Sequence, residues 1–384
     1  MTPSEKYVAE LCEKSFLPFW SFPNPIGKKG KELCDVLVVC GNTIIIISVK
    51  DISISNSKDE MVAYDRWVKK SIYDSATQIY GAEKYLNSVD CILLKDRKTK
   101  IDLPFQQERV IHRIAIAFGG RKDYPMPTGD LGKGFVHVFD KDSTFTVLNE
   151  LDTIIDFSNY LGAKEKFISK KVIITSTESD FLSFYLQTGL DFESCPDVIS
   201  IEQGSWKKYV ETDEYAKWQE DIAPSYIWDF MIDQLYENHV KNKEINSRKD
   251  IERAIRLVNT EPRMHRIVLG EMLEEAINKK IKARMLLPLE GAKHTYVFMP
   301  LTDKNWKEKE KELEYRCVVA RKEIPTVETV IGVAIGSNSK DESCFDIFVI
   351  HMNKLDDKFI EAADFIKEEL GYFSNPTISR SKKE

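Results

Sequence analysis

Residues 34–51, with the sequence CDVLVVCGNTIIIISVKD, form two almost wholly apolar runs on either side of Gly41 and Asn42. A Gly-Asn pair between two such runs indicates the two-residue turn of a β-hairpin. Both faces of each strand are apolar, which is typical of strands that are covered on both sides. The segment therefore predicts a hairpin at the centre of a layered α/β fold.

The turn also predicts the register of this hairpin. If Gly41 and Asn42 form the turn, Cys40 and Thr43 face each other, and Asp35 lies opposite Ser48. Side chains alternate along a strand, so Ser48 and Lys50 share one face. Lys50 is then the diagonal neighbour of Asp35, within reach of a long side chain.

Periodicity predicts further helices and strands along the chain. Thr2, Pro3 and Glu5 open a helix, in which Thr2 caps, Pro3 takes the first helical position and Glu5 completes a capping box. A second helix is predicted over residues 60–88, which have helical spacing and no proline. Strands are predicted near 91–94, 110–118, 134–139, 144–148, 315–321, 329–335 and 345–351, with a mainly helical stretch at 150–310 and a last helix at 356–370.

The length of the chain predicts two domains, because single domains usually contain about 100–200 residues. Its 384 residues are 42% hydrophobic and 30% charged, as in ordinary globular proteins. The pattern changes from strand-rich to helix-rich near residue 160. We therefore expect an α/β N-terminal domain at 1–160 and an α+β C-terminal domain at 161–384. Substrate selection, sensing of a trigger and oligomerisation all stay open as roles of the second domain.

The spacing of the cysteines and the lengths of the apolar runs indicate the cellular compartment of the protein. Seven cysteines lie without CxxC spacing, and several fall in apolar runs. This pattern indicates buried free thiols in a reducing compartment. The first residues lack a basic region followed by an apolar block, and no stretch approaches about 18 uninterrupted apolar residues. We therefore expect a cytoplasmic protein with no membrane as partner.

Asp35 and Lys50 are the candidates for chemistry. They place a carboxylate and an ammonium group together at the end of an otherwise apolar hairpin. Hydrolysis of a phosphodiester requires neutralisation of the phosphate and an activated water, which a carboxylate-bound Mg²⁺ supplies. A nearby lysine can orient the water and stabilise the developing negative charge.

Asp35 followed by Ser48-Val49-Lys50 at the end of an apolar strand resembles the motif of the PD-(D/E)XK nucleases. The expected order of elements in about residues 1–120 also resembles the αβββαβ core of that restriction-endonuclease-like family. The resemblance implies that Asp35 binds Mg²⁺ or Mn²⁺ and that Lys50 is catalytic. It also assigns Glu5 and Gln78 to the site, because they occupy the places of a glutamate on the first helix and a glutamine on the helix after the lysine strand. The implied activity is that of a restriction-type or phage-defence endonuclease that cleaves DNA.

Ser48 departs from the family pattern, since the residue two positions before the lysine is usually an acid. A neutral hydroxyl is a poor ligand for Mg²⁺. Glu5 is the best candidate for the replacement carboxylate and second metal ligand, whereas Asp51 is expected on the opposite face. Two hypotheses follow: a Mg²⁺-dependent deoxyribonuclease, or an inactive nuclease-fold module that binds DNA or a partner protein. RNA is the less favoured substrate, and a second copy of the chain or another component of a defence system stays open as a partner.

Basic residues near the predicted site are candidates for contact with nucleic acid. The net charge of −7 counts against a protein that simply coats DNA, but it is compatible with local basic patches. The glycine-rich loop at residues 27–31 carries three lysines, and two more follow Trp67 on the predicted long helix. Residues 248–284 carry ten Lys or Arg and six acids, a pattern that is also typical of a solvated helix surface. The candidate phosphate-binding residues are Lys28, Lys29, Lys31, Lys69 and Lys70.

Overall fold

The computed structural model describes residues 1–55, 59–121, 126–175, 177–192, 195–241, 248–289, 291–340 and 343–374. Contacts divide the chain into two compact units. The first contains Met1–Asn246 and Ile255–Ile267, and the second contains Ser247–Ala254 and Val268–Glu384. The predicted mixed α/β class is confirmed, because helices and a mixed sheet build the fold.

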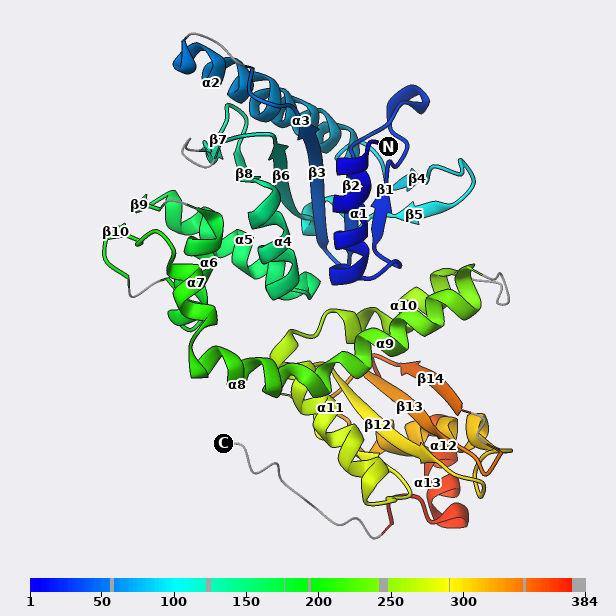
Figure 1. Ribbon diagram of the computed structural model, residues 1–384. Helices are drawn as coiled ribbons and strands as arrows, with labels where there is room; N and C mark the ends of the chain where they lie inside the picture. The colour runs from blue at the N-terminus through cyan, green and yellow to red at the C-terminus, as the bar shows by residue number, and fades with distance from the viewer. Residues whose placement is uncertain are drawn as a thin grey trace. The chain divides into compact units, whose positions relative to one another are not determined.

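The first unit is built on a six-stranded sheet with the order β1-β2-β3-β6-β8-β7 (Figure 1). Strand β2 is antiparallel to both β1 and β3, the strands β3, β6 and β8 are parallel, and β7 is antiparallel to β8. The strands are β1 (Ser21–Pro23), β2 (Val36–Cys40), β3 (Thr43–Asp51), β6 (Val110–Phe118), β7 (Gly129–Asp130) and β8 (Phe135–Phe139).

The predicted hairpin and its register are confirmed. Val36 pairs with Ile47 and Cys40 with Thr43, as a turn at Gly41 and Asn42 requires. Gly41 has a φ of 56°, a left-handed conformation that glycine adopts without steric cost. Because β2 and β3 are buried almost throughout, the hairpin lies in the interior of the sheet.

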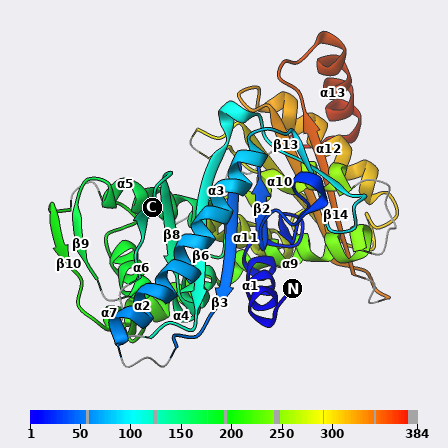
Figure 2. The same ribbon diagram turned by 90° about the horizontal axis from the view of Figure 1, so that it is seen from above.

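Helices cover both faces of this sheet. One face carries α2 (Glu60–Val68), a π-helical turn η2 (Lys69–Tyr73) and α3 (Asp74–Leu86), which cross β3 and β6 (Figure 2). The other face carries α1 (Pro3–Phe16), α4 (Lys141–Glu150) and α5 (Ile154–Ile168). The predicted capping box of Thr2 and Glu5 is present at the start of α1.

The first unit extends beyond the predicted boundary at residues 160 and 161. That position falls inside α5, which packs on β6 of the six-stranded sheet. The stretch that follows also belongs to this unit, because its contacts lie mainly with residues of the same unit. Its elements are α6 (Glu178–Gln187), α7 (Ser205–Val210), α8 (Asp213–Ile222), η4 (Ala223–Ser225), α9 (Tyr226–Leu235) and η5 (Tyr236–Lys241), with the strands β9 (Val172–Ile174) and β10 (Val198–Ser200).

The second unit contains a four-stranded sheet with the order β11-β12-β13-β14. Helix α12 packs closely on β13 at Gly332, where a Cβ atom would lie 2.4 Å from the sulfur of Cys317. Residues of α10 (Arg248–Asn259) and α11 (Arg263–Asn278) are divided between the two units. The remaining elements are β11 (Arg284–Met285), β12 (His294–Leu301), β13 (Thr329–Ser337), β14 (Ser343–His351), α12 (Lys309–Glu323) and α13 (Asp357–Leu370).

Two predictions of secondary structure are wrong. Residues 144–148 lie in α4, because Asp140 caps a helix by accepting a hydrogen bond from the backbone N–H of Ser143 at 2.6 Å. Residues 315–321 lie in α12, where a short apolar run forms the buried side of a helix on a sheet. The stretch at 150–310 is mainly helical, as predicted, and it also contains β12, whose apolar residues are buried in the second sheet.

All seven cysteines are free thiols, as predicted, and four of them are buried. Among the described residues, no helix has both the length and the apolar character needed to span a membrane. Small strands and turns complete the first unit: η1 (Lys28–Gly30), β4 (Cys91–Leu93), β5 (Lys100–Asp102) and η3 (Gln106–Glu108).

Candidate active site

Asp35 lies at the end of the β1–β2 connection, directly before β2. Its backbone joins both neighbouring strands, since its N–H donates to Ile47 and its carbonyl accepts from Asn24. Its side chain is 3% exposed, and its Oδ2 accepts a hydrogen bond from the backbone N–H of Val49 at 2.5 Å. The carboxylate is therefore held against the end of β3, at the residue that precedes Lys50.

Lys50, Ser48 and Gln78 form a hydrogen-bonded group on the face covered by α3. The Nζ of Lys50 and the Oγ of Ser48 both donate to Oε1 of Gln78, at 3.1 and 3.0 Å. Ser48 is fully buried, whereas Lys50 and Gln78 are partly exposed. The structure thus brings together three of the predicted site residues, and Gln78 positions the ammonium group of Lys50.

Two further carboxylates lie near Asp35. The side chain of Glu32 is hydrogen-bonded to Asp35, and the charge of Glu5 is close enough to act on it. Glu5 also accepts a hydrogen bond from the N–H of Thr2 at 2.9 Å, so it has a capping role as well. Sequence reasoning missed Glu32, which precedes Asp35 in an irregular loop. The loop folds back through an antiparallel bridge between Ile26 and Glu32, a contact for which the sequence pattern has no signal.

The carboxylates of Asp35, Glu32 and Glu5 carry more negative charge than the neighbouring groups balance. The pKa of Asp35 is raised to about 6, mainly by burial and in smaller part by the carboxylates of Glu5 and Glu32. The N–H of Val49 and the ammonium group of Lys50 act in the opposite direction. A cation bound at Asp35 would oppose these effects, because opposite charge favours the ionised carboxylate.

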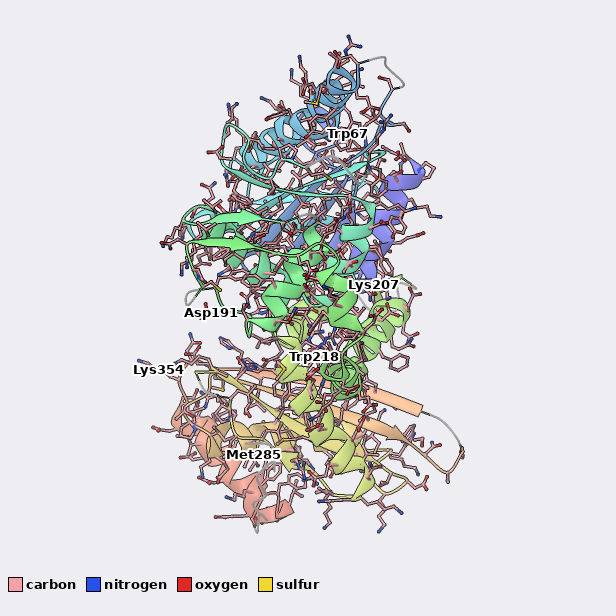
Figure 3. The ribbon with its side chains drawn as sticks, turned by 60° about the vertical axis from the view of Figure 1, so that its left-hand side comes forward. Trp67, Asp191, Lys207, Trp218, Met285 and Lys354 are labelled. Atoms are coloured by element: carbon pink, nitrogen blue, oxygen red, sulfur yellow. The ribbon has the colours of Figure 1, made fainter. Side chains whose placement is uncertain are left out.

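The predicted phosphate-binding lysines are exposed. Lys28, Lys29 and Lys31 belong to the connection that leads into Asp35, so their loop ends at the candidate site. Lys69 and Lys70 lie on the π-helical turn of the helix that carries Gln78. The neighbouring Trp67 (Figure 3) is buried and donates from Nε1 to the carbonyl of Ile52 at 2.7 Å. Trp67 therefore fixes this helix to the sheet and leaves its lysines in solvent.

No model of a known protein family matches this chain, and no curated protein matches it in sequence. The chemistry of Asp35, Lys50 and their neighbours is therefore the basis for a function.

Replacement of Asp35 by asparagine is expected to stabilise the metal-free protein at pH 8. An asparagine Oδ1 can keep the hydrogen bond from Val49, while the buried negative charge is lost. The shift of the Asp35 pKa from 3.8 to about 6 corresponds to about 2–3 kcal/mol, at about 1.4 kcal/mol for each pKa unit. Urea unfolding with a chelator present would measure this gain.

The pH dependence of this effect has a defined sign. Between pH of about 4 and 6 the folded protein binds more protons at Asp35 than the unfolded chain does, so stability falls as the pH rises through this window. The penalty is complete above pH of about 6 and absent below pH of about 4. The D35N variant should therefore match the wild type near pH 4 and exceed it at pH 8. A variant that is less stable than the wild type at pH 8 would show that the Asp35 carboxylate is not under this penalty.

Proposed function

We propose that this protein is a metal-dependent endonuclease that hydrolyses phosphodiester bonds of DNA. The observation that carries the proposal is the convergence of Asp35 and Lys50 at the end of the β2–β3 hairpin, with Gln78 bound to the amine. Apart from the separate two-stranded sheet of β4 and β5, the order α1, β1, β2, β3, α2–α3, β6 follows the αβββαβ order of the PD-(D/E)XK nucleases, which supports the same assignment. A cytoplasmic role in defence against foreign DNA is part of this proposal.

The donor set fits Mg²⁺ or Mn²⁺, because both ions prefer carboxylate oxygens. Asp35 would hold the ion, and Glu32 or Glu5 would supply the second carboxylate that Ser48 lacks. When bound, the ion would neutralise phosphate charge and lower the pKa of a bound water. Glu32 is exposed and its side chain is hydrogen-bonded to Asp35, whereas Glu5 takes part in the capping box. We therefore favour Glu32 over Glu5 as the second carboxylate ligand.

The protein side chains would have separate tasks. Lys50 would donate a hydrogen bond to the attacking water or to the phosphate oxygen on which negative charge develops. Gln78 would keep the amine in position through its carbonyl oxygen. The exposed lysines at 28, 29 and 31 would contact the phosphate backbone, since charged contacts of this kind orient DNA without reading its sequence.

The rival function is a nuclease-fold module that binds DNA or a partner protein without cleaving it. One observation favours it: the hydroxyl of Ser48 is fully buried and bonded to Gln78, so the position of the usual acid holds a structural residue. In this alternative the Asp35 group would be a remnant of a metal site, and the second unit would recruit or recognise a partner.

Supercoiled plasmid incubated with the purified full chain distinguishes these functions. We expect nicking or linearisation with Mg²⁺ or Mn²⁺, none with a chelator, and none with the D35A variant. E32Q and E5Q identify the second acid, because a glutamine side chain at position 5 can still complete the capping box while the charge is removed. Binding of DNA without cleavage by any form would establish the module instead, and a parallel RNA substrate tests the third possibility.

A further inference from the structure

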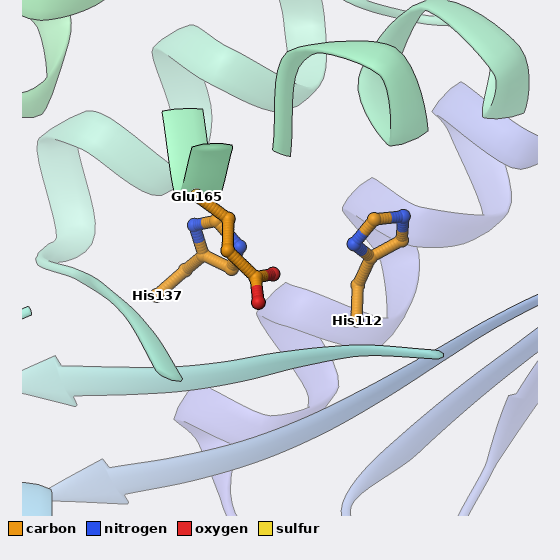
Figure 4. A group of neighbouring side chains, drawn as sticks. All are labelled: His112, His137 and Glu165. Carbon is orange, nitrogen blue, oxygen red and sulfur yellow. The ribbon is translucent and has the colours of Figure 1, made fainter. Parts of the chain in front are cut away.

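A second polar cluster lies on the opposite face of the six-stranded sheet from α3 and Gln78. His112 of β6 and His137 of β8 come from neighbouring parallel strands, and Glu165 comes from α5. His112 alternates along β6 with Arg113, which binds Glu83 of α3 on the other face. One ligand-type atom of each of the three cluster residues lies within 4.8 Å of the other two. Figure 4 shows the Glu165 carboxylate between the two imidazole rings.

The two imidazoles have nitrogen atoms without partners. His137 is 1% exposed, and neither of its ring nitrogens has a hydrogen bond among the described residues. Nδ1 of His112 is also buried without a partner in the described part of the chain, although its Nε2 is 2.8 Å from the Oγ of Ser158. Buried polar atoms nearly always have a partner, so three such atoms beside one carboxylate require an explanation. A bound cation would satisfy two of them, one nitrogen on each ring.

The hydrogen bond of His112 fits metal binding. A metal-bound histidine usually donates its other N–H to an oxygen, which fixes the tautomer and leaves one lone pair for the metal. Ser158 offers that oxygen, so the lone pair of Nδ1 would face Glu165. Ser158 and Glu165 lie seven residues apart on α5. One helix therefore supplies both a ligand and the group that orients another ligand.

The neutral form that burial favours for both imidazoles also suits metal binding. Burial lowers the pKa of His112 to about 4 and that of His137 well below its usual value, so both rings are neutral at pH 7. Metals bind the neutral imidazole. The ammonium group of Lys164 acts on His137 as well, but it is paired with Glu178. Burial raises the pKa of Glu165, and the guanidinium of Arg113 opposes this rise only in part.

We propose that His112, His137 and Glu165 bind one divalent transition metal ion, of the class of Zn²⁺, that joins α5 to β6 and β8. Two nitrogen ligands and one oxygen ligand favour zinc and related ions over Mg²⁺, which prefers oxygen. Ligands about 2.1 Å from a tetrahedral ion are about 3.4 Å apart, a spacing that small side-chain rotations reach from the observed separation. The partial exposure of Glu165 offers a way in for the ion. This site is separate from the proposed Mg²⁺ site.

Titration of the chelator-treated full chain with Co²⁺ and Zn²⁺ tests the proposal. Co²⁺ should give visible ligand-field bands of a nitrogen- and oxygen-ligated ion, without the near-ultraviolet bands of cysteine ligation. Zn²⁺ should displace Co²⁺ with a stoichiometry of one, and should raise the Tm by roughly 5–10 °C at about 100 times its Kd. No visible band and no change of Tm in the wild type would overturn the proposal.

Variants test whether the Co²⁺ spectrum arises from the cluster of His112, His137 and Glu165. H137N and E165Q should each weaken binding at least about 10-fold, since metal affinity depends on each ligand and its support. E165Q keeps the shape of a partly exposed side chain, so it tests the site even if H137N fails to fold. H265N is the matched control, because the half-exposed side chain of His265 pairs with Glu261 outside the cluster. Unchanged Co²⁺ spectra in both H137N and E165Q would contradict the assignment.

Discussion

Replacement of Lys50 by methionine is expected to reduce plasmid cleavage by about 100- to 1,000-fold, the usual effect of removing one preorganised donor to developing negative charge. Methionine keeps most of the aliphatic stem, so packing at the end of β3 is retained while the ammonium group is lost. The hydrogen bond from Nζ to Gln78 at 3.1 Å is lost as well, and Ser48 remains as a donor to the same oxygen. Initial rates of nicking at saturating Mg²⁺ would measure the effect.

A control variant and a binding measurement make the Lys50 prediction specific. K95M changes an exposed lysine in the turn between β4 and β5 and should cleave at the rate of the wild type. DNA binding by K50M, measured by gel shift in Ca²⁺, should change far less than its rate of cleavage does. If K50M cleaves at the wild-type rate, Lys50 has no role in the reaction, even if the protein proves to be a nuclease.

The largest expected loss of stability follows from removing the charge of Asp229. Its two carboxylate oxygens bind two buried arginines of α11: Oδ2 pairs with Arg263 and Oδ1 with Arg266, both at 2.5 Å. The side chains of Arg263 and Arg266 are 7% and 1% exposed. In D229N, Arg263 would keep its ion pair with Asp152, but the buried guanidinium of Arg266 would face only a neutral amide. Breaking a buried ion pair from one side costs about 3–5 kcal/mol, so D229N should unfold at clearly lower urea concentration.

Trp228 offers a local probe of this prediction. Its indole is buried beside the network and donates from Nε1 to the carbonyl of Arg266 at 3.2 Å, so tryptophan fluorescence should follow the loss of this packing. The matched control is E202Q, which removes an exposed ion pair with Lys208 and should cost at most about 1 kcal/mol. Equal urea midpoints for D229N and E202Q would show that the arginines do not depend on Asp229.

The same arginines show a limit of sequence reasoning. Arg263 and Arg266 belong to the basic stretch at 248–284, where interleaved charge favoured a solvated surface or a nucleic-acid contact. Both are buried, because Asp152 and Asp229, which are distant in sequence, neutralise Arg263, and Asp229 also pairs with Arg266. Helical periodicity predicts on which face of its own helix a residue lies. It does not predict which acidic side chain from a distant helix will pair with that residue.

The β2–β3 hairpin was determined by the sequence itself. A two-residue turn at Gly41 and the alternation of side chains are local properties, so they predicted both the register and the shared face of Ser48 and Lys50. Only the tertiary structure decided which groups complete the site: Gln78 from α3, and Glu32 from a loop that folds back on itself. It also decided that two histidines and a glutamate converge on the other face, because that meeting requires two neighbouring strands and a helix packed across them. Contacts between distant segments depend on how whole elements pack, and that packing is a property of the complete core.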